Sequence, residues 1–315
     1  MAHFNTGVRF RRTLLPLHKR PLNALITSST IAASITIVLW ASAFPGIRAA
    51  LHAYTPAHVA LLRYATASLV LAGYALLRRL RLPRWRDLPG MALLGLVGIA
   101  FYNLLLNSGE VSVPSAVASF IIASAPIFMA IEAKVLLGER LRLWGWLGIA
   151  VSFSGVAIMS LLGTSGIHLD WRAVVVLLAA FAQSLYSVKQ KSFLSRYSAF
   201  ECTAYAIWAG TIFLLPFAPG LLTGVERAPL SATLANVYLG VFPGAIAYVS
   251  WAYALSRLPA STAASYLYLV PVVATGIAWL WLGELPSGLA LLGGTFVLIG
   301  VILVNTWGKS ATKEA

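Results

Sequence analysis

The stretch PIFMAIEAKVLLGER, residues 126–140, is echoed by PVVATGIAWLWLGEL, residues 271–285. Both stretches begin with proline, continue with apolar residues and end in Leu-Gly-Glu and one further residue, and corresponding positions differ by 145. The same offset aligns further pairs without a gap: Pro114 and Pro259, Ala118 and Ala263, Gly148 and Gly293, and Gly155 and Gly300. The chain therefore consists of two homologous halves.

The composition excludes an ordinary water-soluble fold. Hydrophobic residues make up 59% of the chain and charged residues only 10%, whereas soluble domains average roughly 25% charged residues. Apolar segments recur between short polar stretches, and about 20 residues of helix are needed to cross a hydrocarbon core. We predict an all-α membrane protein with ten transmembrane helices, at residues 28–51, 58–77, 89–108, 115–137, 143–162, 173–190, 200–217, 233–255, 259–282 and 288–306.

The net charge of +14 is explained by this topology. With the N-terminus inside, 19 of the 23 Lys and Arg fall in inner segments, and three fall in outer ones: Arg48, Arg172 and Arg227. This asymmetry follows the positive-inside rule. We therefore expect a multi-pass protein of the cell inner (plasma) membrane with both termini in the cytoplasm, and a lipid bilayer rather than a nucleic acid as its partner.

Each half contains five predicted spans, and upstream of the repeated proline SAFPGIR (42–48) falls opposite SLYSVKQ (184–190) with a small shift. Because five is odd, the second half must enter the membrane from the opposite side. Inverted repeats of this kind are typical of transporters with a site near the middle of the membrane. We predict a basic cytoplasmic tail at 1–27, a first repeat at 28–162, a second, inverted repeat at 173–306 and a cytoplasmic tail at 307–315.

Four motifs carry a resemblance to a known family. They are VLWASAFPGIR (38–48), LLRYATASLVL (61–71), LLGERL (136–141) and its echo WLGELP (281–286). Together they resemble EamA-type transporters of the drug/metabolite transporter superfamily. The resemblance implies a ten-helix, basket-like carrier that exports amino acids or other metabolites. The second half departs from the pattern, with Gln183 and Trp208 near the places of the Trp40 and Arg63 motifs.

Aromatic and polar residues deep in the predicted spans are the candidates for substrate contact. A tyrosine hydroxyl in hydrocarbon needs a polar partner, so part of this set should face a cavity, although hydrogen bonds between helices are an alternative. Aromatic walls with few charges suit a neutral or aromatic amino acid. The predicted substrate contacts are Trp40, Arg63, Tyr102, Asn103, Ser119, Phe120, Gln183, Tyr248, Trp251 and Tyr266.

Two ionisable residues leave alternatives open. Arg63 begins about five residues inside its span, so its guanidinium either snorkels to the headgroups or faces the cavity and attracts a carboxylate. Glu132 lies near the inner end of the fourth span, with Lys134 two residues on and so on a different helix face. Glu132 either lies in the interface or takes part in proton coupling.

The repeated motif itself predicts structural roles. Pro126 and Pro271 lie in the middle of spans four and nine, where proline removes a backbone donor and kinks a helix, and we expect the pair to act as hinges. Glu139 and Glu284 follow a glycine at a helix end. We expect each carboxylate to accept hydrogen bonds from the first N–H groups of the next span.

The sequence predicts no enzyme, metal or cofactor. Cys202 is the only cysteine, which excludes a disulfide within the chain and a cysteine-based metal site. Ser165 lies in a GxSG pattern, but it falls in a predicted loop and no histidine lies deep in a span, so no catalytic site is expected. No phosphate-binding glycine-rich loop with lysine is present. The partner we expect is a small-molecule substrate; a non-transporting receptor or structural protein is the alternative, and the oligomeric state is open.

Overall fold

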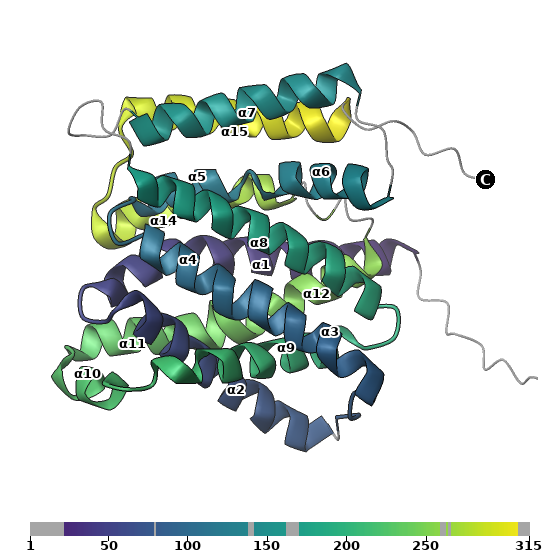
Figure 1. The fold of residues 1–315 in the computed structure, drawn as a ribbon, viewed down its shortest axis with the longest axis vertical. Coiled ribbons are helices and arrows are strands. Elements are labelled where there is room, and N and C mark those ends of the chain that lie inside the picture. Colours follow the sequence, from purple (N-terminus) through teal and green to yellow (C-terminus); the bar gives the residue numbers. More distant parts are fainter. Residues whose placement is uncertain are drawn as a thin grey trace, which may run out of the picture.

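The computed structural model describes residues 22–78, 80–137, 142–161, 170–258, 263 and 266–307. These residues form helices joined by short connections, and no strand occurs among them (Figure 1). The first half contains α1 (Leu22–Leu51), α2 (Pro56–Arg78), η1 (Trp85–Asp87), α3 (Leu88–Leu94), the π-helical η2 (Gly95–Phe101), α4 (Tyr102–Gly109), α5 (Ser115–Ile122), α6 (Ala125–Leu137) and α7 (Leu143–Leu161).

The second half repeats this order. It contains α8 (Trp171–Phe193), α9 (Ala199–Leu214), η3 (Leu215–Phe217), α10 (Leu221–Arg227), α11 (Leu230–Leu239), the π-helical η4 (Gly240–Ile246), α12 (Ala247–Arg257), η5 (Leu267–Leu269), α14 (Val270–Leu282) and α15 (Gly288–Thr306). The short helix α10 and the two π-helical segments were not predicted from the sequence.

Six helical segments of the described chain are long and apolar enough to cross a membrane: Ser28–Leu51, Pro56–Leu77, Trp85–Gly109, Trp171–Phe193, Ala199–Phe217 and Leu230–Arg257. Four shorter apolar helices lie at the positions of predicted spans four, five, nine and ten: Ser115–Met129, Leu143–Ile158, Leu267–Leu282 and Gly288–Val304. Two of the four, Ser115–Met129 and Leu267–Leu282, belong to predicted spans four and nine, in which the α-helix is broken close to a proline. The all-helical membrane fold is thereby confirmed.

The offset of 145 found in the sequence also relates the helix boundaries. Adding 145 to the bounds of α6 gives those of α14, and adding it to the bounds of α7 gives those of α15. Adding 145 to the bounds of η2 likewise gives those of η4, so each half has its π-helical segment at the equivalent place. The repeat is therefore structural as well as sequential, and it extends upstream to Gly95 and Gly240 without the shift seen earlier in the chain.

The two repeats interlock instead of forming separate bodies. The first helix of each repeat packs against the third and fourth spans of the other: α1 contacts α12 and α14, while α8 contacts α4 and α6. The π-helical segments follow the same rule, because η2 packs on α9 and η4 packs on α2. A space between α1, α4, α5, α6, α8, α12 and α14 is consequently lined by both repeats.

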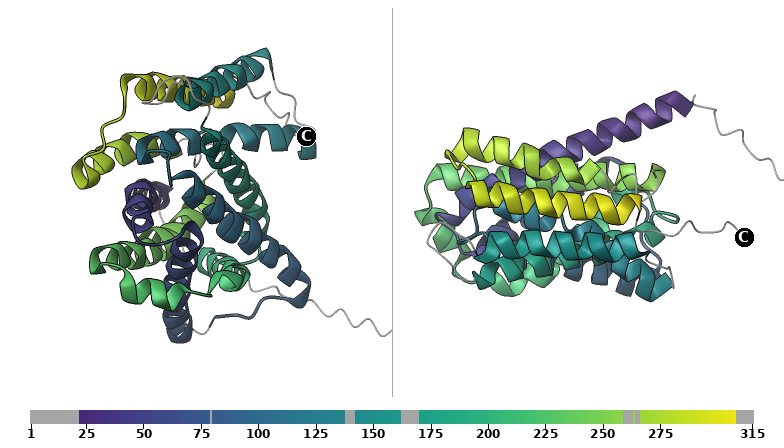
Figure 2. Two further views of the ribbon diagram at one scale, coloured as in Figure 1. Left: turned by 60° about the vertical axis from the view of Figure 1, so that its left-hand side comes forward. Right: turned by 90° about the horizontal axis from the view of Figure 1, so that it is seen from above.

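The helices α7 and α15 form one outer layer, and they lie side by side in Figures 1 and 2. Gly148 lies against Gly300, and Gly155 lies against Gly293. Residue numbers rise along one helix while they fall along the other, so these equivalent helices run antiparallel. Small residues at such a contact let two helix backbones approach closely, as the sequence pattern of these spans indicates.

Polar residues begin several helices. Ser198 and Glu201 form a capping box at the start of α9, Asp170 accepts from the backbone N–H of Arg172 at α8, and Ser287 accepts from that of Ala290 at α15. These side chains satisfy N–H groups that have no partner within the helix.

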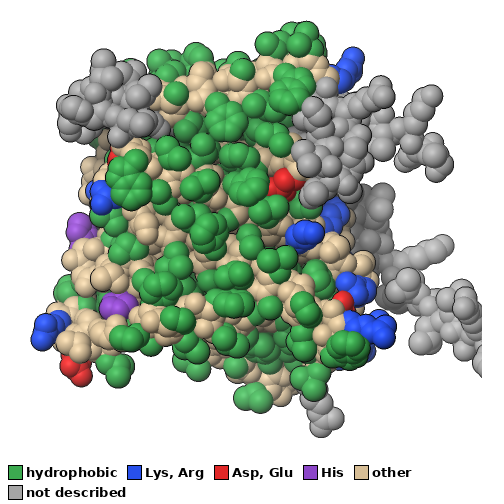
Figure 3. Space-filling view, viewed as in Figure 1, with side chains coloured by type: hydrophobic (Ala, Val, Ile, Leu, Met, Phe, Trp, Pro, Cys, Tyr) green, Lys and Arg blue, Asp and Glu red, His purple; other side chains and the backbone are tan. Residues whose placement is uncertain are grey.

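The surface has the distribution expected of a protein in a bilayer. Figure 3 shows Lys and Arg at the two edges where the helices end, with a mostly apolar face between them. Leu69, Leu76 and Leu280 in the helices are 74%, 85% and 78% exposed. Exposed apolar surface on this scale indicates contact with lipid instead of water.

The glycine contact between α7 and α15 predicts a sharp difference between two substitutions. A Cβ on Gly148 would lie 2.6 Å from the carbonyl oxygen of Gly300, whereas a Cβ on Gly276 of α14 meets nothing within 4 Å. We expect Gly148→Val to lower the free energy of unfolding by about 1–3 kcal/mol through overpacking, and Gly276→Val to change it little. Thermal unfolding in detergent micelles measures both variants; equal melting temperatures would contradict the contact.

Candidate functional site

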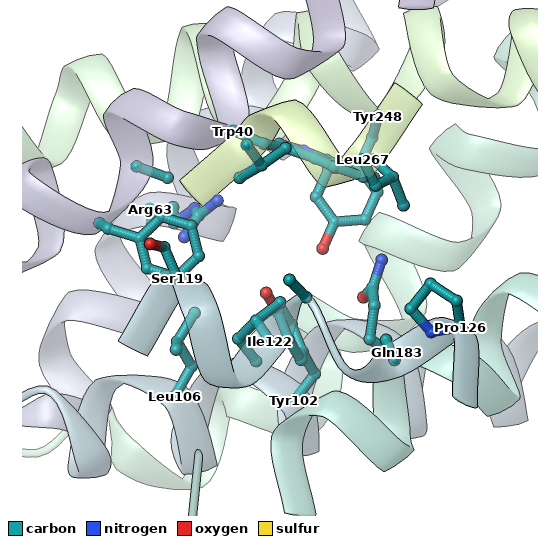
Figure 4. A pocket seen from close by; sticks show the side chains of 15 residues that line it. Trp40, Arg63, Tyr102, Leu106, Ser119, Ile122, Pro126, Gln183, Tyr248 and Leu267 are labelled. Carbon is teal, nitrogen blue, oxygen red and sulfur yellow. The ribbon is translucent and has the colours of Figure 1, made fainter. Parts of the chain in front are cut away.

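A central cavity lies where the two repeats meet (Figure 4). About 60 Å³ of it is open to the centres of water molecules, several times the roughly 10–15 Å³ that one water requires. Its lining comes from α1, α2, α4, α5, α6, α8, α12, η5, α14 and the α5–α6 connection, and consists of Trp40, Ala43, Phe44, Arg63, Tyr102, Leu106, Ser119, Ile122, Ala123, Ala125, Pro126, Gln183, Tyr248, Leu267 and Val270.

The break between α5 and α6 forms one wall of the cavity. The fourth span is interrupted at Ala123 and Ser124, and Pro126 is the second residue of α6. The structure thus replaces the predicted kink in a continuous helix by two helices, because proline is tolerated at a helix start, where its missing N–H is not needed. Ala123, Ala125 and Pro126 all face the cavity, and irregular backbone at this depth is tolerated where it lines a cavity.

The ninth span contributes an equivalent wall. There, the 3₁₀ turn η5 precedes α14, and Pro271 is the second residue of α14, as Pro126 is of α6. Leu267 and Val270 line the cavity, whereas Pro271 is buried just beyond it. The two predicted proline sites thus lie at matching helix starts, and residues beside both of them line the same space. Their role as hinges remains a prediction.

Aromatic side chains form a second part of the wall. The Trp40 ring lies 5.3 Å from the Tyr248 ring in an edge-to-face arrangement, a geometry that aromatic pairs favour. Tyr248 also contacts the rings of Tyr64 and Tyr186, at 6.4 Å and 5.9 Å. These contacts between α1, α2, α8 and α12 hold the cavity-facing rings in fixed positions.

Arg63 provides the positive charge of the cavity. It is 2% exposed, and its Nη1 donates to the Asn103 side-chain oxygen over 3.1 Å. Asn103 in turn donates to the Tyr64 hydroxyl at 2.9 Å and to the Ile99 carbonyl at 2.8 Å, and the Tyr64 hydroxyl donates to that of Tyr248 at 3.3 Å. Of the two orientations that the sequence left open for Arg63, the structure has the one that faces the cavity.

Three cavity residues carry a buried polar atom with no hydrogen-bond partner among the described residues. They are Nε of Arg63, Nε1 of Trp40 and Oε1 of Gln183. Buried polar groups in native proteins almost always have partners, so these atoms mark places where a solute can bind. Figure 4 shows Arg63 and Gln183 on opposite sides of the cavity. The three atoms offer a solute two N–H donors, from Arg63 and Trp40, and one acceptor, from Gln183.

Six of the ten predicted contact residues line the cavity: Trp40, Arg63, Tyr102, Ser119, Gln183 and Tyr248. The other four lie behind it or away from it. Asn103 is fully buried and accepts a hydrogen bond from Arg63. It therefore positions a lining residue but does not line the cavity itself. Trp251 packs against the Trp40 ring at 5.5 Å and is separated from the cavity by that ring.

Phe120 and Tyr266 also lie outside the lining, for a shared reason: both point toward a neighbouring helix. The Phe120 ring fills the space beside Gly294 of α15. The Tyr266 hydroxyl lies 3.2 Å from Thr30 Oγ1 of α1, which satisfies it away from the cavity. Both placements correct the prediction that these residues face the substrate space.

Several lining residues were missed in the sequence, among them Phe44, Leu106, Ile122 and Leu267. They are ordinary apolar residues in apolar spans, and only their nearness to a helix break distinguishes some of them. Proline at matching positions is the signal that could have pointed to the small residues Ala123 and Ala125, because the residues flanking a break face the space that the break opens.

Comparison with known proteins identifies the family. The model of the EamA-like transporter family matches residues 27–161 and again residues 170–306. The chain belongs to the EamA-like transporter family. It is therefore a membrane transporter, as the doubled motif indicated.

Relatives of this EamA-like transporter span nearly its full length. It is 44% identical over 290 residues to a probable terminal-alkyne amino-acid exporter of Streptantibioticus cattleyicolor, covering 92% of this chain and 97% of that protein. It is 43% identical over 271 residues to the uncharacterized transporter YdfC of Bacillus subtilis, covering 86% and 89%. One solved crystal structure has the same fold, with a TM-score of 0.62 at 22% identity, covering 88% of this chain and 96% of that one.

A charged cluster lies one helical turn beyond the lining residues Phe44 and Leu106, at one end of the EamA-like cavity. Arg48 lies one helical turn beyond Phe44 on α1, and its Nη1 donates to the carbonyl oxygens of Glu110 and Val111 at 2.6 Å and 3.0 Å. Its Nε lies 3.4 Å from Oε1 of Glu284. The cluster thus joins α1 to the connection between α4 and α5 and to the end of α14.

Glu284 caps a helix other than the one we predicted. Its Oε2 accepts from the backbone N–H of Ser115 at 3.3 Å, at the start of α5, whereas Ser287 caps α15, the span that follows Glu284 in the chain. The carboxylate therefore links the two repeats across the cavity end. Glu139, its counterpart in the first repeat, lies outside the described residues, as does Ser165.

Glu110 is the unusual member of this end of the transporter. It follows the apolar segment that ends at Gly109, is fully buried, and neither of its carboxyl oxygens has a hydrogen-bond partner among the described residues. Burial raises the pKa of this carboxyl well above its usual range, the nearby Glu284 carboxylate raises it further, and Arg48 opposes the shift. The carboxyl therefore keeps its proton at pH values where an exposed glutamic acid has lost it.

This raised pKa predicts how stability depends on pH. Because the folded protein holds a proton that the unfolded chain releases, stability is greatest below the ordinary glutamic acid pKa and falls as the pH rises through the window above it. We expect Glu110→Gln to reduce this fall as the pH rises above the ordinary glutamic acid range, measured by thermal unfolding in detergent. The exposed Glu226 of α10 provides the control, since Glu226→Gln should leave the slope unchanged; an unaltered slope in Glu110→Gln would refute the assignment.

Proposed function

We propose that this EamA-like transporter exports neutral or aromatic amino acids across the inner membrane by alternating access. The observation that carries the proposal is the central cavity, which combines one arginine, aromatic walls and three buried polar atoms without partners. A non-transporting receptor or structural protein is not favoured, because the chain belongs to a transporter family.

The chemistry of the lining supports an amino acid as the solute. Arg63 and Trp40 offer N–H donors and a positive charge for a carboxylate, since charge-assisted hydrogen bonds to arginine are strong and directional. Gln183 offers an acceptor for an N–H group. Tyr102, Tyr248 and Trp40 provide apolar faces for the body of the molecule, and their ring faces attract an ammonium group.

The relatives support the same class of substrate. The Streptantibioticus protein is named as a probable exporter of terminal-alkyne amino acids, which are amino acids with an apolar side chain. The Escherichia coli relative YedA, 28% identical over 278 residues, is named as an inner membrane transporter. The first name fits a cavity with a single described cation and apolar walls, and the second supports only transport at the inner membrane.

For alternating access, we infer ten spans arranged as two inverted repeats of five. The six long apolar segments support six of these spans, and the four shorter apolar helices at the predicted positions are consistent with the other four. The antiparallel contact of the equivalent helices α7 and α15 supports inversion, because helices related by a two-fold axis in the membrane plane cross the bilayer in opposite directions. The excess of Lys and Arg in predicted inner segments supports cytoplasmic termini.

Thiol labelling tests this topology directly. In a Cys202→Ala background, we expect Arg142→Cys and Leu285→Cys, at exposed positions that follow α6 and α14, to react with a membrane-impermeant reagent from opposite faces. Arg227→Cys of α10 is the control, and it should react from the same face as Leu285→Cys. Labelling of residues 142 and 285 from one face would contradict the inverted arrangement.

Transport in proteoliposomes tests the function. We expect counterflow of L-phenylalanine and L-propargylglycine, a terminal-alkyne amino acid, but not of L-lysine or L-glutamate. Arg63→Gln should weaken apparent substrate affinity by about tenfold or more, because hydrogen bonds to charged groups contribute roughly 1.5–3 kcal/mol. Tyr102→Ala should also weaken it, through loss of an aromatic wall.

The matched control for these variants is Tyr266→Phe. It removes a hydroxyl that lies beside Thr30 outside the cavity, so its counterflow should equal that of the unmodified protein. Unchanged kinetics in both Arg63→Gln and Tyr102→Ala would show that the cavity is not the binding site. Absence of counterflow for every amino acid would contradict the proposed substrate class.

A further inference from the structure

Glu132 is a buried carboxyl that the proposed substrate site does not use. It lies on α6 and is 6% exposed, six residues beyond the cavity-lining Pro126 and thus about 9 Å further along the helix. The side chain faces α8, where it meets Ser184. Ser184 directly follows the cavity-lining Gln183, so the Glu132–Ser184 contact joins two helices that both contribute to the cavity wall.

The Ser184 hydroxyl has more acceptors than it can serve. Its oxygen lies 2.5 Å from Oε1 of Glu132 and 2.8 Å from the carbonyl oxygen of Phe181, three residues earlier on the same helix. A serine hydroxyl carries one hydrogen, but its oxygen can also accept. When the serine hydrogen lies on the backbone carbonyl, the contact with Glu132 needs a proton from the carboxyl, because the carbonyl has none to give.

The position of Ser184 within a helix indicates which acceptor receives its hydrogen. Serine within a helix commonly donates to a carbonyl three or four residues earlier, and Ser187 does so toward Gln183 on α8. With the Ser184 hydrogen on Phe181, the contact with Glu132 is a hydrogen bond only if the carboxyl is the donor. Glu132 then carries a proton.

The equivalent serine of the first repeat gives an internal comparison. Ser42, which aligns with Ser184 in the sequence repeat, lies 2.8 Å from the Leu39 carbonyl oxygen, again three residues earlier. Its second contact, at 2.7 Å, is the hydroxyl of Tyr238 on α11. A tyrosine hydroxyl can donate, so this arrangement is complete without ionisation. At Ser184 a glutamic acid takes the place of the phenol, and it completes the arrangement only when protonated.

The surroundings offer an ionised Glu132 no compensation among the described side chains. Its helix packs on α8 and α15, and α15 contains no ionisable residue. Lys189 and Lys191 of α8 are exposed, and Lys191 lies seven residues from Ser184, about 10 Å along the helix. Within the described part of the chain, Oε2 of Glu132 has no hydrogen-bond partner, and burying an unpaired charge is strongly unfavourable.

We propose that Glu132 is a proton-binding site whose occupancy is coupled to the movement of α6 against α8, which makes the carrier an amino acid/proton exchanger. The inference rests on the proposed amino acid export. In the conformation seen here the proton lies between Glu132 and Ser184. When α6 leaves α8, the carboxyl meets water and gives its proton to it. The ionised form cannot return to the closed α6–α8 contact until it binds a proton again.

The proposal follows from a difference in energy between two conformations. A proton shifts a conformational equilibrium only when it binds the two states unequally. Here Glu132 binds the proton more tightly in the closed state, where it contacts Ser184, than in the open state, where it is exposed to water. Pro126 and Gln183 move with the same helices, so the change at Glu132 alters the cavity wall. Export of the substrate then proceeds while a proton moves in the opposite direction.

Infrared spectroscopy tests the protonation without any transport measurement. A protonated carboxyl has a carbonyl stretching band that a carboxylate lacks. We expect purified protein in detergent at pH 7 to show such a band that disappears in Glu132→Gln and moves to a different frequency in Ser184→Ala. Glu110→Gln, which removes a different buried carboxyl, should retain the Glu132 band. Identical spectra for the unmodified protein and Glu132→Gln would overturn the proposal.

Proteoliposomes containing a pH-sensitive dye test the coupling. Efflux of L-phenylalanine should carry protons into the vesicles, and an imposed gradient of one pH unit should support up to about tenfold accumulation when one proton is exchanged. Glu132→Gln keeps a donor for Ser184 but cannot ionise. We expect it to retain L-phenylalanine counterflow, which needs no net proton movement, and to lose both the dye response and the accumulation.

The controls separate the possible failures. Tyr238→Phe removes the equivalent donor to Ser42, a group that is not proposed to release its proton, and should leave proton coupling intact. Counterflow without proton movement in the unmodified protein, or unchanged proton movement in Glu132→Gln, would overturn the coupling. Absence of counterflow for any amino acid in the unmodified protein would contradict the proposed function instead, and the infrared band would still decide whether Glu132 carries a proton. If Glu132→Gln fails to fold, Ser184→Ala is expected to weaken the coupling and can take its place in both assays.

Discussion

Every backbone N–H and C=O group in a bilayer must find its partner within the protein, and the arrangement around the cavity follows from this constraint. A continuous helix meets it without help, whereas an interrupted helix leaves free polar groups. The interruptions before Pro126 and Pro271 therefore occur where the chain is surrounded by other helices. Because both interruptions border one space, the irregular backbone and the polar side chains gather in a single place, and the lipid-facing surface remains regular and apolar.

The repeat determines which helices surround that space. Since α1 packs on the spans of the second repeat and α8 packs on those of the first, neither repeat can form the cavity alone. The pair α7 and α15 stands outside it as a closely packed layer, and its glycine contacts leave little freedom for sliding. Movement that opens the cavity must then involve the helices that line it, among them α5, α6 and η5 next to the breaks.

The sequence allowed the architecture to be predicted because the relevant signals are long and redundant. Span positions follow from apolar length, and the repeat follows from many paired residues. Individual side chains were predicted less well, since a span that is apolar all round has no periodicity to show which face points inward. Tyr266 was placed in the cavity for its depth alone, whereas its hydroxyl lies beside Thr30 in the structure. Trp251 was predicted to face the cavity although it is only four residues from a predicted span end, and it packs against Trp40. Contacts between the repeats join residues far apart in the sequence, and Glu284 and the start of α5 are separated by 169 positions. No local sequence pattern predicts such contacts.

The two ends of the cavity are not chemically equivalent, although the repeats are related in sequence. Arg48 holds one end through two carbonyl oxygens and Glu284. Its counterpart in the aligned sequence of the second repeat is Gln190, a buried neutral residue that donates to the Tyr186 hydroxyl on its own helix at 2.7 Å. A symmetric carrier would have two closed ends of equal energy. With an ion pair at one position and a neutral side chain at its equivalent, the inward-facing and outward-facing conformations differ in energy, and a substrate shifts the equilibrium between them only by its differential affinity for the two.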